Sequence, residues 1–327
     1  MKIHYTLDDS AARLPLTIRS ADALWDHAAE LRSAPGVQLV ELTTQYMLNT
    51  GAALFDEMAH YFEMGAPSEA DPYALGYCYA QRVQLEDLLG DLHDAQPGLV
   101  ALHEVAEMFP ITFTHDLQFT LALTTVGAPA FGYVRTYADS EGEEYHGMVV
   151  NLAQARPHLE SILGQFSLEL LIRVIRHGFF NHEGFLLAYA SYRQATGRIT
   201  EKLSERLKDI LMSRGIAWYL SYRHDLAFYD HALNLDETRL VGQVEHCNAM
   251  IGSARKKRAT EDTPDEWFPG QQPGDHCLDL VGYYAARTVA AAHGVARLRD
   301  AIVQGADYFI ETYNALSRPD LNLRPRL

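Results

Sequence analysis

The residues best suited to chemistry lie in the stretch RVIRHGFFNHEGF, at positions 173–185. His177 and position 181 are about one helical turn apart, a spacing at which two imidazoles can bind the same metal ion. The zinc pattern H-E-x-x-H needs Glu at 178 and His at 181. The chain has Gly178 and Asn181 instead. The stretch therefore keeps the first histidine of a zinc site and lacks both its general base and its second histidine.

His182 and Glu183 follow directly and offer a second way to build a site. The pattern also fails when it starts at His182, because Leu186 stands where the second histidine belongs. On a regular α-helix, His182 points about 140° away from His177. A rebuilt site from His177, His182 and Glu183 therefore requires an irregular turn near Gly184. Such a site, with zinc or another divalent metal, is the alternative to a protein that binds no metal.

One long helix is expected to position these residues. Ser167 is a typical helix cap and Gly197 a typical helix end, which predicts roughly eight turns if nothing interrupts them. Apolar residues line two faces of this segment, so we expect it to be buried on most sides. An ordinary buried helix, with each histidine satisfied by a carbonyl or a carboxylate, is the alternative to a functional site.

The surrounding elements indicate an α+β fold that is mostly helical. Residues 20–108 have helical apolar spacing and form, with the chain start, an N-terminal helical region of residues 1–108. Thr, Val, Phe and Tyr concentrate in residues 111–152, which predicts a small sheet of about three strands before the central helix. Helices return after Pro157, so the second region spans residues 109–327.

This order of elements resembles that of gluzincin-type zinc metallopeptidases, and in particular of small, uncharacterised predicted zinc peptidases. In that family the H-E-x-x-H helix follows a sheet edge, and a later E-G-x-A-x-Y segment supplies the third zinc ligand. RGIAWY at 214–219 matches this segment except at Arg214, and VGYYAA at 281–286 resembles a late helix of the family. The resemblance covers about residues 110–315 and implies a zincin architecture.

Matched to the family pattern, the chemistry is degenerate. Gly178 has no side chain to act as base, Asn181 is a poor zinc donor, and Arg214 puts a permanent cation where a ligand carboxylate belongs. The resemblance therefore implies a metallopeptidase-like pseudoenzyme with no zinc at the usual site. We expect it to bind a small anionic molecule or a peptide, or to act as an accessory protein. The expected ligand-binding residues are His177, Asn181, Arg214 and Tyr219.

Arg214 has two interpretations. A guanidinium is a planar donor fork that suits carboxylate and phosphate groups, so it can anchor an anionic ligand. It can equally form an internal ion pair, with Glu183 or an acidic residue of 225–237 as the expected partner. A further H-E-x-x-E pattern at His103, Glu104 and Glu107 is expected to be a solvated helix face.

Composition excludes several other classes. The formal charge is −16, from 27 basic and 43 acidic residues, so binding to nucleic acid or to an anionic membrane surface is not expected. No stretch reads as a signal peptide or membrane span, which favours a cytoplasmic protein. The three cysteines, Cys78, Cys247 and Cys277, form no C-x-x-C pair and are expected to be reduced and buried. The sequence does not indicate an oligomeric state.

Overall fold

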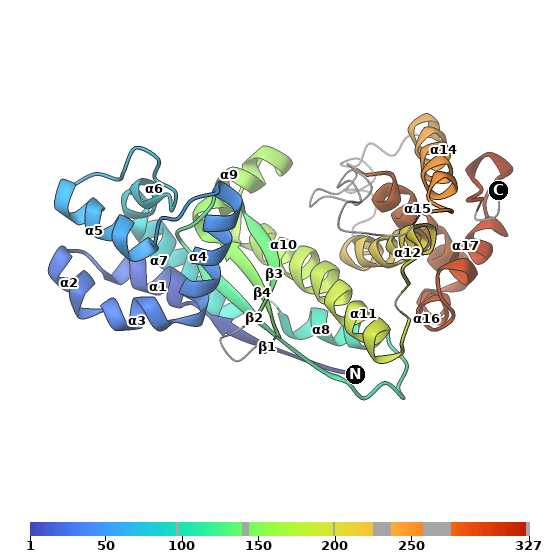
Figure 1. The fold of residues 1–327 in the computed structure, drawn as a ribbon, viewed down its shortest axis with the longest axis horizontal. Helices are drawn as coiled ribbons and strands as arrows, with labels where there is room; N and C mark the ends of the chain where they lie inside the picture. The colour runs from blue at the N-terminus through green and yellow to red at the C-terminus, as the bar shows by residue number, and fades with distance from the viewer. Residues whose placement is uncertain (96–97, 139–143, 199, 225–236, 258–275, 325–327) are drawn as a thin grey trace. The chain divides into compact units, whose positions relative to one another are not determined.

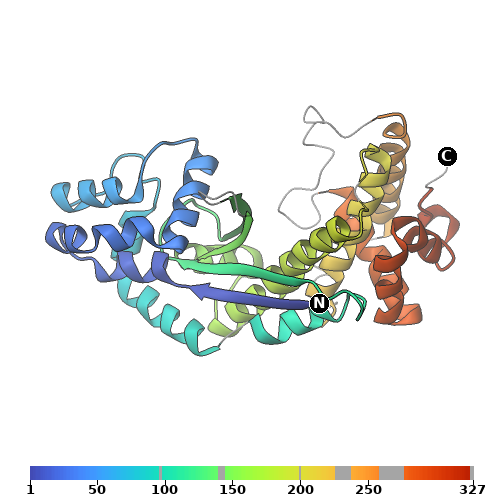
Figure 2. The same cartoon turned by 60° about the horizontal axis from the view of Figure 1, so that its bottom comes forward.

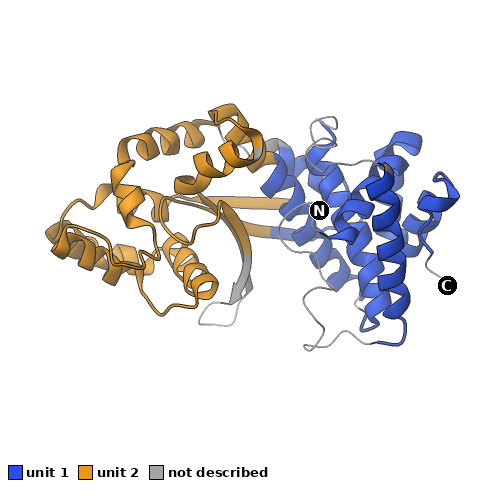
Figure 3. Cartoon of the chain, turned by 90° about the horizontal axis from the view of Figure 1, so that it is seen from above, with its two compact units in different colours: residues 1–2, 100–117, 177–327 blue, residues 3–99, 118–176 orange. Residues whose placement is uncertain are grey.

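The computed structural model describes residues 1–327 except 96–97, 139–143, 199, 225–236, 258–275 and 325–327 (Figure 1). The chain is α+β and mostly helical, as the sequence predicts. It forms two compact units, which Figure 3 colours separately. Unit 1 comprises residues 1–2, 100–117 and 177–327, and unit 2 comprises residues 3–99 and 118–176.

Unit 2 contains the sheet and most of the N-terminal helices. The strands are β1 (Lys2–Asp8), β2 (Asp116–Thr124), β3 (Gly132–Ala138) and β4 (Glu144–Asn151). The first helices are α1 (Ser10–Thr17), α2 (Ala21–Asp26), α3 (Ala28–Ser33), α4 (Pro35–Leu48) and α5 (Leu54–Met64). The later helices are α6 (Leu75–Ala80), α7 (Arg82–Ala95), α9 (Leu152–Leu163) and α10 (Leu168–Val174).

The sheet has four strands in the order β1-β2-β4-β3. Strand β4 pairs parallel to β2, with Leu121 opposite Met148, and antiparallel to β3, with Tyr133 opposite Val149. Three of these strands lie within residues 111–152, as predicted. The fourth, β1, was missed. Its burial alternates residue by residue, which is the mark of a half-covered strand, but the run is short and lies at the chain start.

Helix α4 packs against β4. Leu39 of α4 fills the space above Gly147 so closely that a Cβ at 147 would lie 2.5 Å from the Leu39 Cδ2 atom. A larger residue at 147 would therefore force the Leu39 side chain to move. Figure 2 shows β1 and β2 as long neighbouring strands.

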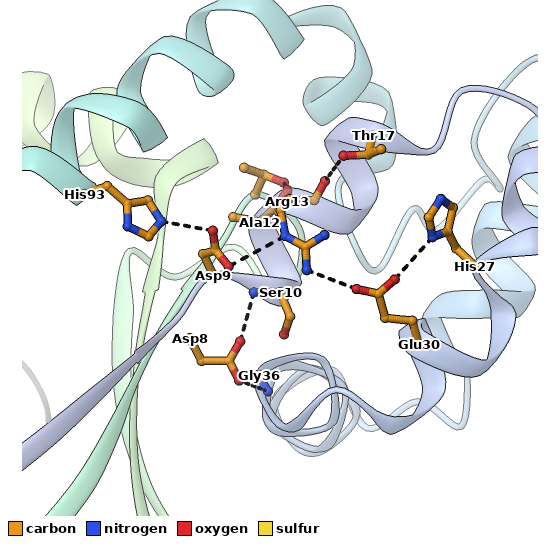
Figure 4. Close-up of polar contacts among 11 residues, drawn as sticks. Asp8, Asp9, Ser10, Ala12, Arg13, Thr17, His27, Glu30, Gly36 and His93 are labelled. Atoms are coloured by element: carbon orange, nitrogen blue, oxygen red, sulfur yellow. Dashed lines mark hydrogen bonds and ion pairs between the residues drawn. The ribbon is translucent and has the colours of Figure 1, made fainter.

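The end of β1 is fixed by two consecutive aspartates (Figure 4). The Asp8 carboxylate accepts hydrogen bonds from the backbone N–H groups of Ser10 and Gly36, both at 2.9 Å, so it binds the first turns of α1 and α4 together. Asp9 contacts His93 Nε2 of α7 at 2.9 Å. The Asp8 contacts satisfy helix N-terminal donors that would otherwise lack partners. The Asp9 contact links the start of α1 to α7, so both acids have a structural role.

Unit 1 contains the remaining helices. They begin with α8 (Gly98–Ala106), the π-helix η1 (Ile175–Glu183), α11 (Gly184–Ala195) and α12 (Leu203–Tyr222). They end with α14 (Glu237–Ser253), α15 (Cys277–His293), α16 (Val295–Gln304), α17 (Ala306–Asn314) and the short 3-10 helix η3 (Pro319–Leu321). The chain passes between the units within β1, β2, α8 and η1.

Helices α12 and α15 meet at two glycines. A Cβ at Gly215 would lie 2.3 Å from the carbonyl carbon of Gly282, so the two backbones are in direct contact. Beside this contact Trp218 and Tyr222 of α12 pack with Tyr283 of α15 in a buried cluster. The two segments that carry the family resemblance in the second half of the chain are therefore packed on each other.

The central helix is helical over its predicted length but is not one regular α-helix. It consists of α10, then the nine-residue π-helix η1, then α11. A π-helix joins residue i to i+5, so residues five apart lie closer to one face than in an α-helix. Phe179, Phe180, Asn181 and His182 of η1 are all buried, as expected for a covered helix.

Candidate functional site

The carboxylate of Glu104 and four other polar side chains of unit 1 form a group that we call the Glu104 cluster. Its members are Glu104 of α8, His177 and Asn181 of η1, and Arg223 and His224 at the end of α12. Three separate segments thus supply the cluster, and the π-helix supplies its interior end.

Asn181 is the buried centre of the Glu104 cluster, with a side chain that is 0% exposed. Its Nδ2 group donates to Glu104 Oε2 at 3.3 Å and to the Leu220 carbonyl at 3.2 Å, and it lies 3.3 Å from His177 Nδ1. Among the described residues its Oδ1 atom has no hydrogen-bond partner. A buried acceptor of this kind needs a donor, from a water molecule, an ion or a ligand.

The other end of the Glu104 cluster reaches solvent. Arg223 caps the C-terminus of α12, where its guanidinium contacts Glu104 Oε2 at 2.9 Å and donates to His224 Nε2 at 3.2 Å. The exposed fraction of the side chain rises from 22% at Glu104 to 53% at His224. The ring centroids of His177 and His224 are 5.7 Å apart. A molecule in solvent therefore meets a cation and an imidazole before the buried amide.

A second group of side chains lies around His182. Its Nδ1 atom is 2.9 Å from Glu183 Oε1, and its ring lies against Trp218 with centroids 3.8 Å apart. Burial alone would raise the pKa of Glu183, but the neighbouring His182 and Arg214 outweigh it and lower that pKa. The ionised carboxylate thus orients the His182 ring. The His182 Nε2 atom is buried and has no hydrogen-bond partner in the described part of the chain.

Arg214 forms a two-point ion pair with Asp279 of α15. The Nε and Nη2 groups donate to the two carboxylate oxygens at 2.5 and 3.2 Å, and the Asp279 side chain is 1% exposed. The guanidinium thus neutralises a buried charge. Asp279 was not among the partners expected from the sequence, and residues 225–236, which include several of those partners, lie outside the described residues.

The structure brings together only some of the residues expected at a ligand site. His177 and Asn181 are in contact within the Glu104 cluster. Arg214 belongs to the group around Glu183 and Asp279. Tyr219 is partly buried against the aromatic cluster of α12 and α15, and burial raises the pKa of its hydroxyl.

The rebuilt metal set also separates into two environments. His177 faces Asn181 and His224, whereas His182 faces Glu183 and Trp218. Within the described ranges, no group of three or more His, Cys, Asp or Glu side chains is placed to hold a metal ion. The irregular turn that this set required is nevertheless present, as the π-helix.

Three members of the Glu104 cluster were not expected at the site. The prediction of a solvated face agrees with the exposure of His103 and Glu107, at 75% and 53%, but it is wrong for Glu104, at 22%. Helix spacing alone could not distinguish Glu104 from His103 and Glu107, because Asn181, the hydrogen-bond partner of Glu104, lies far along the chain. Arg223 and His224 stand in a polar stretch with no diagnostic spacing.

None of the described helices has both the length and the apolar character needed to cross a membrane. Comparisons with protein-family models, with curated proteins and with solved structures each found no match.

Proposed function

We propose that the chain is a metallopeptidase-like protein without the peptidase's zinc chemistry, which binds a small anionic molecule or a peptide carboxylate at the Glu104 cluster. One observation carries this proposal. Asn181, which stands where the resemblance implies the second zinc histidine, is built into a hydrogen-bonded cluster that opens to solvent at Arg223 and His224.

The geometry favours Arg223 over Arg214 as the anchor for the anion. Arg214 is held at two points by a fully buried carboxylate, so releasing it would leave Asp279 as an unpaired buried charge. Arg223 faces the partly exposed Glu104, which can turn toward water when a ligand carboxylate replaces it. The Oδ1 acceptor of Asn181 favours ligands that also carry an N–H donor, as peptides do.

The two classes of ligand are tested by calorimetric titration with succinate and with the dipeptide glycyl-leucine. Glu104→Gln removes the charge that competes with the ligand carboxylate for Arg223 and keeps a side chain of the same size that can still form hydrogen bonds. It should therefore tighten binding roughly tenfold or more. Arg223→Met should abolish binding. His103→Ala, on the exposed face of the same helix, is the matched control and should bind like the parent.

Retention of parental affinity for either probe in folded Arg223→Met would show that Arg223 is not the anchor. Failure of both probes to bind the parent and Glu104→Gln would contradict the proposed function itself. The alternative, a metal-dependent enzyme that includes His177 and His182, is separated by metal analysis of the same preparation.

A further inference from the structure

A hollow of about 630 Å³ lies on the surface of unit 1, between the segment that follows α8 and helix α16. Its lining combines apolar and charged side chains, which we call the Ile111 face: Glu107, Phe109, Pro110, Ile111, Arg299, Asp300 and Val303. Apolar residues bordered by charges around one hollow are typical of a protein–protein contact.

Ile111 lines this hollow and has a side chain that is 95% exposed. It lies in a turn that is closed by a hydrogen bond from the Phe113 N–H to the Pro110 carbonyl, at 2.9 Å. Turns mainly use Gly, Pro, Asn, Asp and Ser, whereas isoleucine is apolar and stiff. An isoleucine at this position leaves nearly its whole side chain in water, and contact with another apolar surface would cover it.

The turn that carries Ile111 is held in place on both sides. Phe109 stacks on Phe185 with ring centroids 5.8 Å apart, and Phe113 packs edge-on against Tyr192 with centroids 5.0 Å apart. Ile111 is therefore presented from a fixed backbone. A partner that covers it does not have to order this segment, which lowers the entropic cost of association.

Charges of both signs border the hollow. Arg299 Nη2 lies 3.4 Å from Glu107 Oε2, and Arg297 Nη1 lies 3.5 Å from Asp300 Oδ2. These four side chains are between 39% and 53% exposed. Exposed ion pairs contribute little to stability, so each charge can exchange its partner for another. Arg299 and Asp300 are thus available to opposite charges on a second molecule.

We propose that the Ile111 face is a contact between two copies of this chain, related by a two-fold axis. A face that holds both a projecting apolar side chain and a hollow, and both a cation and an anion, is complementary to itself. Ile111 of each copy enters the hollow of the other and packs against Val303. Arg299 of each copy pairs with Asp300 of the other. Because the contact is two-fold, each of these interactions forms twice.

Sedimentation velocity of the full-length protein over a range of concentrations tests this contact. The parent should shift with concentration to twice the mass of one chain. Ile111→Asp places two carboxylates in the apolar contact and should weaken association roughly tenfold or more. Since Ile111 is almost fully exposed, the variant should fold like the parent, which circular dichroism verifies. Val83→Asp, at a 59% exposed valine of α7 in unit 2, is the matched control and should associate like the parent.

The charged residues allow a second test that does not depend on comparing stabilities. Arg299→Asp leaves acidic side chains at both 299 and 300, and Asp300→Arg leaves basic side chains at both positions. Each variant alone should therefore associate more weakly than the parent. An equimolar mixture places the acidic positions of one variant opposite the basic positions of the other, so it should recover a mixed dimer. A variant that had lost its fold would not show this recovery.

A parent that stays monomeric up to about 100 μM would overturn the proposal. A dimer that persists unchanged in Ile111→Asp would also overturn it, because the copies would then meet at another face. The same holds if the two charge variants associate no better when mixed than alone. The outcome is independent of the proposed ligand site, since no ligand is added.

Discussion

Arg214 of α12 holds the buried carboxylate of Asp279 of α15 through two hydrogen bonds. The pair lies next to the contact between Gly215 and Gly282, so it fixes the two helices at the point where their backbones touch. The Arg214 cation thus has a structural partner. This relationship makes the energetic role of Arg214 testable apart from any ligand.

Arg214→Met should destabilise the protein by about 3–5 kcal/mol, because it leaves Asp279 as a buried and unpaired charge. Urea unfolding measures this loss. Arg173→Met, at an exposed pair with Glu169, is the control and should change stability by no more than about 1 kcal/mol. The double variant Arg214→Met, Asp279→Leu should recover most of the loss, and a double variant as unstable as Arg214→Met would refute the ion-pair account.

Gly215→Ala should destabilise the protein by roughly 1–3 kcal/mol, because the new methyl group would overlap the backbone of α15. Gly242→Ala is the matched control in α14, where a Cβ meets nothing within 4 Å. That change should be neutral or stabilise by up to about 1 kcal/mol through helix propensity. Similar unfolding midpoints for both variants would contradict the close packing of α12 and α15.

Glu183 should make stability depend on pH in the acid range. Its pKa is lower in the folded protein than in the unfolded chain, so the stabilisation is complete above the unfolded value of about 4.3 and is lost as pH falls through the folded value. Glu183→Gln should flatten the change in melting temperature below about pH 5. Glu169→Gln, whose side chain is 84% exposed, should leave the parental profile unchanged, and a parental profile in Glu183→Gln would contradict this role.

The sequence predicted the fold class and the covered central helix because both follow from the spacing of apolar residues. It predicted three strands and missed β1 (Lys2–Asp8). The short alternating run of β1 is a weak indication of a strand unless the neighbouring strand β2 is known. The π-helix was anticipated only as an irregular turn that His177 and His182 would require. A nine-residue π-helix leaves no periodic pattern long enough to recognise in the sequence.

The site was less accessible to prediction than the fold. His177 and Asn181 could be found because four-residue spacing places them on one face. Glu104, Arg223 and Asp279 could not, since each meets its partner through packing between segments distant in sequence. Spacing identifies neighbours within one helix, whereas contacts between helices depend on the tertiary fold.

The family resemblance predicts that zinc binding can be restored. Gly178→Glu, Asn181→His and Arg214→Glu rebuild the expected ligands, and Asp279→Asn removes the carboxylate that would repel the new Glu at 214. This variant should bind zinc more tightly than the parent, because it adds three donors to His177. The structure does not preform the set, since position 214 faces Asp279 whereas His177 and position 181 lie in the Glu104 cluster. Asn181→His alone is the control. Parental zinc affinity in the folded quadruple variant would count against the metallopeptidase-like backbone.

The central claim is that the chain binds a ligand without the zinc chemistry of the family it resembles. Elemental analysis of protein purified without a histidine tag tests this most directly. We expect zinc, iron and manganese each to be far below one atom per chain, in protein that still binds a carboxylate probe. One tightly held metal atom per chain, which is lost when His177 or His182 is replaced by alanine, would contradict the account and establish the rebuilt metal site.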